Sequence, residues 1–175
     1  DKNGGVQLSG KNVGIIGVGN IGKDLISLLK PFGCVVYVND IIQQDEYYKR
    51  NNLIKATKEE IYRKCDIITI HTPSNDLTRG MINKSVFTMM KKEAYFINTA
   101  RGDIVVQEDL KWALKEKIIA GAAIDVYDQE PPKDYEFISL PNLICTPHIG
   151  GNAKVAVLAM GESAIENLVN YFREN

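Results

Sequence analysis

The feature that most constrains the fold of this chain is an alternation of short apolar runs with segments of helical periodicity. The runs are rich in β-branched residues, as in residues 13–16, 35–38 and 67–70. Between the first two runs, in residues 21–29, apolar side chains recur every three or four positions. This alternation is typical of βαβ units and of a parallel sheet that helices cover on both faces. We therefore predict an α/β fold with a doubly wound parallel sheet.

The expected elements follow from the same pattern. We predict strands at 13–16, 34–38, 66–70, 94–97, 120–126 and 143–145, and helices at 21–29, after Thr57, and at 83–90, 108–117 and 153–172. Pro31 and Gly33 end the first helix, and Thr57 with Glu60 matches a capping box. Residues 127–141 are rich in proline and show no periodicity, so we predict a long loop there, of the kind that often carries function.

Length and charge limit the functional classes. The 175 residues suit one domain, and 21 basic against 22 acidic residues give no reason to expect nucleic acid or an anionic membrane as a partner. No apolar stretch approaches the roughly 20 residues that span a bilayer. The three cysteines show no CxxC pairing and no metal-ligand spacing, so we expect buried thiols in a cytoplasmic protein and no metal site. Residues 1–11 lack an initial Met and a signal-peptide pattern, and we expect a piece of a longer protein.

A GxGxxG pattern follows the first predicted strand and opens the first predicted helix, with glycines at Gly17, Gly19 and Gly22. In that context the pattern predicts a Rossmann-type dinucleotide site, in which the backbone approaches a pyrophosphate at the start of a helix. Asp40 ends the second strand, where a carboxylate can accept hydrogen bonds from a ribose. The residues at 41–43 supply no cation, so we predict NAD rather than NADP. The alternative is a related fold that binds another ligand, such as a methyl donor.

Two histidines, His71 and His148, both follow predicted strands, where ligands of doubly wound sheets bind. His71 lies in a His-Thr-Pro sequence and either packs structurally or lines the cofactor crevice. His148 lies in Thr-Pro-His-Ile-Gly-Gly, downstream of Arg101 and Glu130. We weigh a surface ion pair for Arg101 and a solvated loop charge for Glu130 against catalytic roles.

Four blocks in this order resemble the D-isomer-specific 2-hydroxy acid dehydrogenase family, whose members act on D-3-phosphoglycerate, D-glycerate or hydroxypyruvate, and D-lactate. The resemblance covers nearly the whole chain. Besides the glycine pattern, the matching blocks are Cys65–Pro73, Phe96–Gly102, Gly121–Val126 and Thr146–Gly151.

The resemblance implies a role for each matching residue. Arg101, Glu130 and His148 correspond to the catalytic residues: a guanidinium that holds a 2-oxo acid, and a carboxylate that orients an imidazole acid and base. The expected NAD contacts are the three glycines of the pattern together with Asn20, Ile21, Asp40, His71, Thr72, Pro73, Thr99 and Asp125.

By the same resemblance, residues 1–175 are an NAD-binding domain whose flanking substrate-binding domain is absent from this chain. We expect a small D-2-hydroxy or 2-oxo acid as substrate, little activity of the fragment alone, and a homodimer formed through this domain. Glu130 argues against a formate dehydrogenase, which carries Gln at that position. The alternative is an NAD-sensing interaction protein of the corepressor type, which uses the same fold. The sequence does not specify which acid is the substrate.

Overall fold

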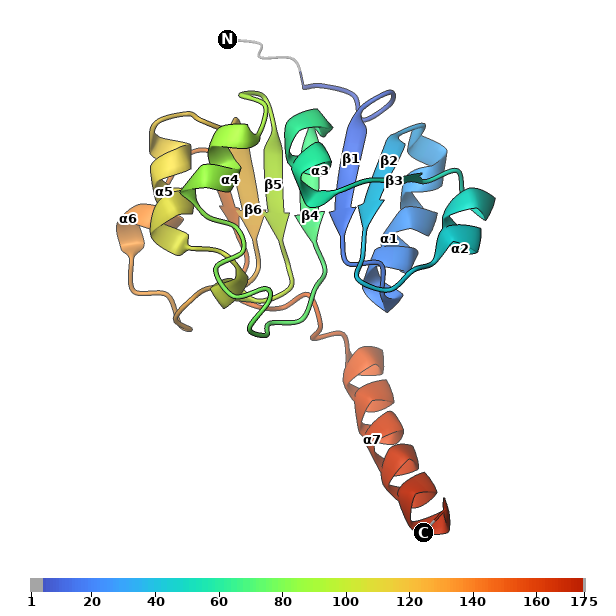
Figure 1. Ribbon diagram of the computed structural model, residues 1–175. Helices are drawn as coiled ribbons and strands as arrows, with labels where there is room; N and C mark the ends of the chain where they lie inside the picture. Colours follow the sequence, from blue (N-terminus) through green and yellow to red (C-terminus); the bar gives the residue numbers. More distant parts are fainter. Residues whose placement is uncertain (1–4, 175) are drawn as a thin grey trace.

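Seven parallel strands form a single sheet in the computed structural model, which describes residues 5–174 (Figure 1). The strand order is β3-β2-β1-β4-β5-β6-β7. This confirms the predicted Rossmann-type sheet. The strands are β1 (Asn12–Ile16), β2 (Val35–Asn39), β3 (Ile54–Lys55), β4 (Ile67–Ile70), β5 (Tyr95–Asn98), β6 (Gly121–Ile124) and β7 (Leu143–Cys145).

Helices cover the two faces of the sheet unequally, and Figure 1 shows α3, α4 and α5 lying in front of it. From β1 to β3 the chain adds strands in one direction across the sheet, and after β3 it returns to the other side of β1 and adds β4 to β7 in the opposite direction. Because crossovers between parallel strands are right-handed, α1 and α2 lie on one face of the sheet and α3 to α6 on the other. Each face has its own core, a large one around Phe87 and Phe96 and a small one around Ile15, Ile26 and Val38. The helices are α1 (Asn20–Leu29), α2 (Asp45–Arg50), α3 (Lys58–Lys64), α4 (Lys84–Met89), α5 (Gln107–Lys115) and α6 (Tyr135–Ile138).

Local sequence signals account for several helix ends. The Thr57 hydroxyl accepts a hydrogen bond from the Glu60 N–H, and the Glu60 carboxylate accepts one from the Thr57 N–H, so the predicted capping box of α3 is confirmed. Asn83 caps α4, because its side-chain oxygen accepts a hydrogen bond from the Ser85 N–H. After α1, Gly33 has φ 66° and ends a short 3-10 helix, as the glycine there predicts.

Two expectations were wrong in detail, and one pair of elements was not predicted. The region 127–141 contains the short helix α6, because Asp134 caps it by accepting from the Phe137 N–H. The pair α2 and β3 was not predicted, since two residues of strand and six of helix give too short a periodic signal. Only Cys65 is buried, whereas Cys34 and Cys145 are half-buried.

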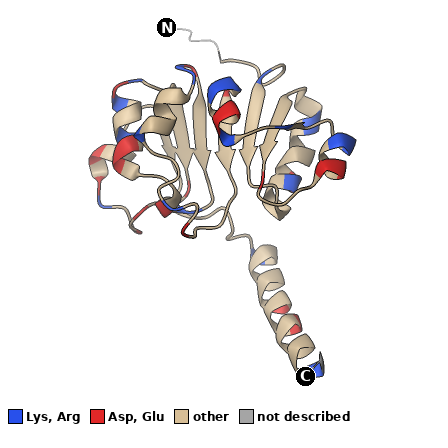
Figure 2. Cartoon of the chain, in the orientation of Figure 1, with Lys and Arg blue, Asp and Glu red and all other residues tan. Residues whose placement is uncertain are grey.

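The last helix, α7 (Lys154–Glu174), extends away from the sheet at the carboxyl ends of the strands (Figure 1). Nearly all of its described side chains are exposed, and Figure 2 shows few charges along it. On α2, α3 and α5, by contrast, Figure 2 shows both signs of charge intermixed. Within the described residues, no helix combines the length and the apolar character needed to cross a membrane.

Candidate active site

All of the predicted site residues lie near one edge of the sheet. Because the strands are parallel, their carboxyl ends meet at this edge, where ligands of such sheets bind. One residue follows each of six strands closely: Gly17 after β1, Asp40 after β2, His71 after β4, Arg101 after β5, Asp125 after β6 and His148 after β7.

A cavity of about 450 Å³ opens at this edge beside β1, β2 and β4. Six of the predicted cofactor contacts line it, namely Gly17, Gly19, Asp40, His71, Thr72 and Pro73. The exposed apolar side chains of Ile41, Ile42 and Leu77 also line the cavity. An apolar slot beside a carboxylate and a glycine loop suits the adenosine half of a dinucleotide.

The glycine loop has the backbone geometry that a dinucleotide requires. Gly17 has φ 98°, and a Cβ there would lie 2.6 Å from the His71 carbonyl oxygen. A Cβ at Gly22 would overlap the Gly17 carbonyl, so a side chain would push α1 away from the loop. Gly19 is exposed, and a Cβ there would meet no atom within 4 Å. Gly19 therefore leaves open the space that a pyrophosphate would take.

Asp40 holds the glycine loop from the neighbouring strand. One of its carboxylate oxygens accepts from the Val18 N–H at 2.5 Å, and the other accepts from the Ile42 N–H at 2.8 Å. The Gln44 amide donates to the Val18 carbonyl at 3.1 Å, so the loop is clamped through both backbone groups of Val18. The clamp by Gln44 was not predicted, because no motif marks it.

One buried polar atom in the cavity wall has no partner within the described residues. The Thr72 hydroxyl oxygen is buried and forms no hydrogen bond there. Buried hydroxyls are normally satisfied, and a bound ligand can supply the missing partner. Together with the open space at Gly19 and the Asp40 carboxylate, this atom shows that the residues present fit a dinucleotide.

The glycine loop yields the first prediction. Gly19→Ala should leave the melting temperature within a few degrees of the wild type, because the new methyl group meets open space, but should weaken NAD binding by at least about tenfold, because it occupies the pyrophosphate position. Calorimetric titration and thermal unfolding measure the two effects. A matched Gly161→Ala change, in α7 and with no atom near the added Cβ, should leave NAD binding intact. Unaltered NAD affinity in Gly19→Ala would contradict this location for the pyrophosphate.

The environment of His71 separates it from His148. Burial lowers the pKa of His71, which favours the neutral ring, and Nε2 lies 3.1 Å from the Thr69 hydroxyl. A neutral ring tied to its own strand is suited to a wall of the cavity rather than to proton transfer. Of the two interpretations of His71, its place in the cavity lining favours the cofactor crevice.

His148 and Glu130 form a direct pair at the carboxyl ends of β6 and β7. His148 Nδ1 lies 2.7 Å from Glu130 Oε2, and both side chains are more than a third exposed. The hydrogen bond with His148 is the main cause that holds the pKa of Glu130 below its ordinary value, so the carboxylate is charged at neutral pH. Since Nδ1 faces Glu130, Nε2 is the nitrogen left for a substrate.

Asp125 fixes the loop that carries His148. Its carboxylate accepts from the Thr146 hydroxyl at 2.5 Å and from the Ile149 and Gly150 N–H groups at 3.0 and 2.9 Å. Burial alone would raise the pKa of Asp125, but these hydrogen bonds outweigh burial and lower it. The bonds span His148, whose φ of 53° is uncommon for a residue with a side chain. Asp125 thus positions His148, whereas the sequence suggested only a cofactor contact.

Tyr127 connects the three loops that carry Arg101, Glu130 and His148. Its N–H donates to Glu130 Oε1 at 3.1 Å, and its hydroxyl donates to the Thr146 carbonyl at 2.9 Å. A Cβ at Gly102 would overlap the Tyr127 carbonyl, so the turn after Arg101 packs directly against the same residue. Burial raises the pKa of Tyr127 to about 12, which keeps the hydroxyl protonated as a donor.

The Arg101 side chain is exposed and donates to the carbonyl of Ala100 at 2.6 Å. Among residues 5–174 it pairs with no carboxylate, which removes the surface ion pair considered above and leaves guanidinium donors for a ligand. Five predicted cofactor contacts do not line the cavity beside β1. Asn20 and Ile21 open α1 and are exposed, Gly22 follows them in α1, Thr99 is exposed after β5, and Asp125 follows β6.

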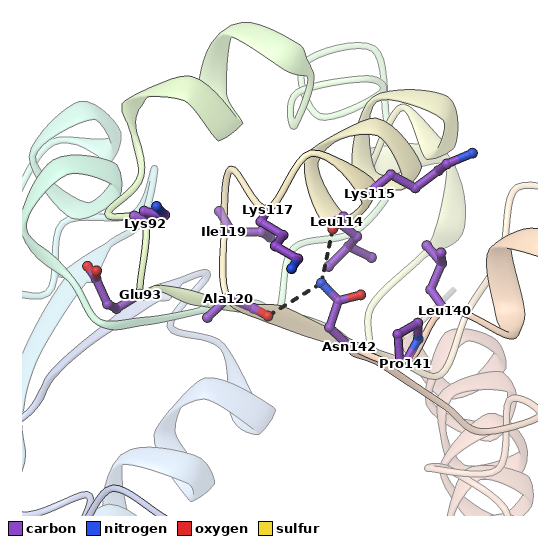
Figure 3. A pocket seen from close by; sticks show the side chains of 10 residues that line it. All are labelled: Lys92, Glu93, Leu114, Lys115, Lys117, Ile119, Ala120, Leu140, Pro141 and Asn142. Atoms are coloured by element: carbon purple, nitrogen blue, oxygen red, sulfur yellow. Dashed lines mark hydrogen bonds between the residues drawn. The ribbon is translucent and has the colours of Figure 1, made fainter. Parts of the chain in front are cut away.

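A second hollow, of about 570 Å³, lies at the opposite edge of the sheet (Figure 3). Its lining precedes β5, β6 and β7, and the Asn142 amide points to the Leu114 and Ala120 carbonyls, to which it donates at 3.1 and 3.4 Å. These bonds satisfy loop carbonyls, and none of the predicted catalytic residues lies there. The carboxyl edge is therefore the candidate active site.

Comparisons with known proteins agree with this geometry. Residues 1–150 match the model of the D-isomer-specific 2-hydroxyacid dehydrogenase NAD-binding domain. The D-3-phosphoglycerate dehydrogenase of Bacillus subtilis is 37% identical over 167 residues, which cover 95% of this chain and 32% of that enzyme. The formate dehydrogenase of Arabidopsis thaliana is 36% identical over 170 residues, which cover 95% of this chain and 44% of that enzyme.

Among solved structures, the NAD-complexed D-isomer-specific 2-hydroxyacid dehydrogenase of Lactobacillus delbrueckii ssp. bulgaricus aligns with a TM-score of 0.85 at 28% identity, over 96% of this chain and 55% of that one. The chain spans less than half the length of these curated relatives. The glycine loop, the carboxyl-edge cavity and the matched model agree, and the chain belongs to the D-isomer-specific 2-hydroxyacid dehydrogenase family as an NAD-binding domain.

Proposed function

We propose that this domain is part of an NAD-dependent oxidoreductase that interconverts a small D-2-hydroxy acid and its 2-oxo acid. The observation that carries the proposal is the 2.7 Å pair of Glu130 and His148 at the ligand-binding edge of the sheet. A carboxylate paired with one imidazole nitrogen stabilises the charged ring and directs the other nitrogen toward substrate. The nicotinamide, when bound, supplies or accepts the hydride.

The three proposed catalytic residues have separate tasks. The Arg101 guanidinium binds the carboxylate and the carbonyl oxygen of the 2-oxo acid through its planar set of donors. In reduction, His148 Nε2 gives a proton to the substrate oxygen, and in oxidation it takes that proton from the hydroxyl. Glu130 stays charged in both directions and stabilises the ring while it holds the proton.

The extent of the domain and its partners are part of the proposal. We assign residues 1–175 to the NAD-binding domain and infer a further substrate-binding domain in the parent enzyme, because the relatives are more than twice as long as their matched parts. A homodimer formed through this domain accords with the family resemblance. Glu130 in place of Gln favours a hydroxy acid over formate as substrate.

The second prediction concerns the 175-residue chain alone. It should bind NAD but reduce 2-oxo acids far below the typical enzyme rate of about 10 per second, because closure by a second domain excludes water and completes the site. Calorimetry with NAD and steady-state assays with a panel of 2-oxo acids measure both properties. The intact parent enzyme is the control. Typical turnover by the 175 residues alone would refute the two-domain architecture, and absence of NAD binding would refute the cofactor site.

A further inference from the structure

Lys58 places a positive charge in the cofactor cavity that the sequence-based choice of NAD over NADP did not include. That choice rested on the absence of a cation at 41–43. Lys58 opens α3, eighteen positions after Asp40, and lines the same cavity as Asp40, Ile41 and Ile42. The expectation that no cation lies near Asp40 is therefore wrong, because the cation comes from the start of α3 rather than from the loop after β2.

Strand register puts Lys58 at the ribose end of the cavity rather than at the pyrophosphate end. β2 and β3 run parallel with Val38 opposite Lys55, and beyond that pair the Asn39 amide donates to the Ala56 carbonyl at 2.7 Å. Asp40 directly follows Asn39, and Lys58 follows Ala56 by two residues. Asp40, which is expected at the ribose hydroxyls, and Lys58 therefore both follow the ends of two paired strands, β2 and β3.

The Lys58 ammonium lacks an anionic partner in the part of the chain that the structure describes. Its only hydrogen-bond acceptor there is the Met81 thioether, with Nζ and Sδ 3.1 Å apart. Sulfur is a weak acceptor, so little is lost when the ammonium turns to a ligand. Lys55 of β3 differs in this respect, since it pairs with Asp45 at 2.8 Å.

We propose that Lys58 is a cofactor-specificity residue whose ammonium receives the 2′-phosphate of NADP and so offsets the repulsion by Asp40. A lysine binds phosphate as a point charge, and a cation near the ribose is the feature that accommodates a 2′-phosphate in this class of fold. The domain therefore binds NAD and retains measurable affinity for NADP. The inference rests on the proposed function only in that NAD occupies the cavity beside Asp40.

The test is calorimetric titration of the intact parent enzyme with NAD and with NADP at low salt. Lys58→Met keeps the length of the side chain and removes its charge, and the NADP-to-NAD affinity ratio should fall by about tenfold, as expected for loss of a charged hydrogen bond. Lys58→Arg, which keeps the charge, should keep the ratio within about threefold of the wild type. Raising the salt should shrink the difference between the wild type and Lys58→Met, because the contact is partly exposed.

Lys64→Met is the matched control, because it removes the same charge from the other end of α3, where Lys64 pairs with Glu60 at 3.0 Å. It should leave both affinities unaltered. A ratio that stays constant in Lys58→Met overturns the proposal, and so does equal weakening of both cofactors, which would mean that Lys58 contacts the adenine. Wild-type enzyme that binds NAD but has no measurable NADP affinity also overturns it. Failure to bind either cofactor would instead refute the cofactor site itself.

Discussion

Replacing His148 by Asn in the intact parent enzyme should lower kcat/KM for the 2-oxo acid by 10² to 10⁴, the range expected for loss of a positioned general acid. Asn suits the test because it tolerates the left-handed backbone of His148, with φ 53°, better than most residues do. The Asp125 hydrogen bonds to Ile149 and Gly150 should therefore persist in the variant. Steady-state kinetics with saturating NADH measure the loss.

His71→Asn is the matched control for this experiment. His71 lines the cofactor cavity and burial keeps its ring neutral, so the change should raise the KM for NADH and lower kcat by less than tenfold. Loss of catalysis in His71→Asn with retention in His148→Asn would reverse the roles given to the two histidines. Retention of activity in both variants would show that neither histidine transfers the proton.

The central strands of the sheet were predictable from the sequence, because a strand that is buried on both faces consists almost entirely of apolar residues. The predicted bounds of β7 match, those of β1 and β4 differ by one position at one end, and those of β5 are shifted by one position. The short pair α2 and β3 gave no such signal. The prolines in 127–141 masked α6, whose Asp134 cap depends on a local turn rather than on periodicity.

The residues of the candidate site that belong to a sequence motif were predictable. Residues whose role depends on contacts made only in the folded chain were not. Glu130 and His148 are eighteen residues apart in the sequence, yet β6 and β7 bring them to 2.7 Å. The part played by Tyr127 depends on three loops that meet only in the fold. Lys58 reaches the cavity because β3 pairs with β2, and β3 was not predicted.

Glu130→Gln should keep the shape of the Glu130–His148 pair and remove its negative charge. Glu130 is charged at neutral pH, because its hydrogen bond with His148 lowers the pKa of the carboxyl. Without that charge the protonated ring of His148 is less favoured, so reduction, which needs the proton, should fail at a lower pH. Oxidation needs the neutral ring and should persist to a lower pH than in the wild type.

Solvent limits the size of this displacement. Both side chains are more than a third exposed, so water and salt screen the interaction and keep the displacement small. Product release can hide the displacement in kcat. The specificity constant for the acid substrate, taken with cofactor saturating, avoids that masking.

The measurement that tests the proposed mechanism most directly is therefore the pH dependence of kcat/KM in both directions, for the wild-type parent enzyme and for Glu130→Gln. The mechanism predicts that the alkaline limb of reduction and the acid limb of oxidation both move to lower pH by the same amount. If both limbs stay in place and only the height of each profile falls, Glu130 orients His148 without stabilising its charge, and the proposed proton transfer is contradicted.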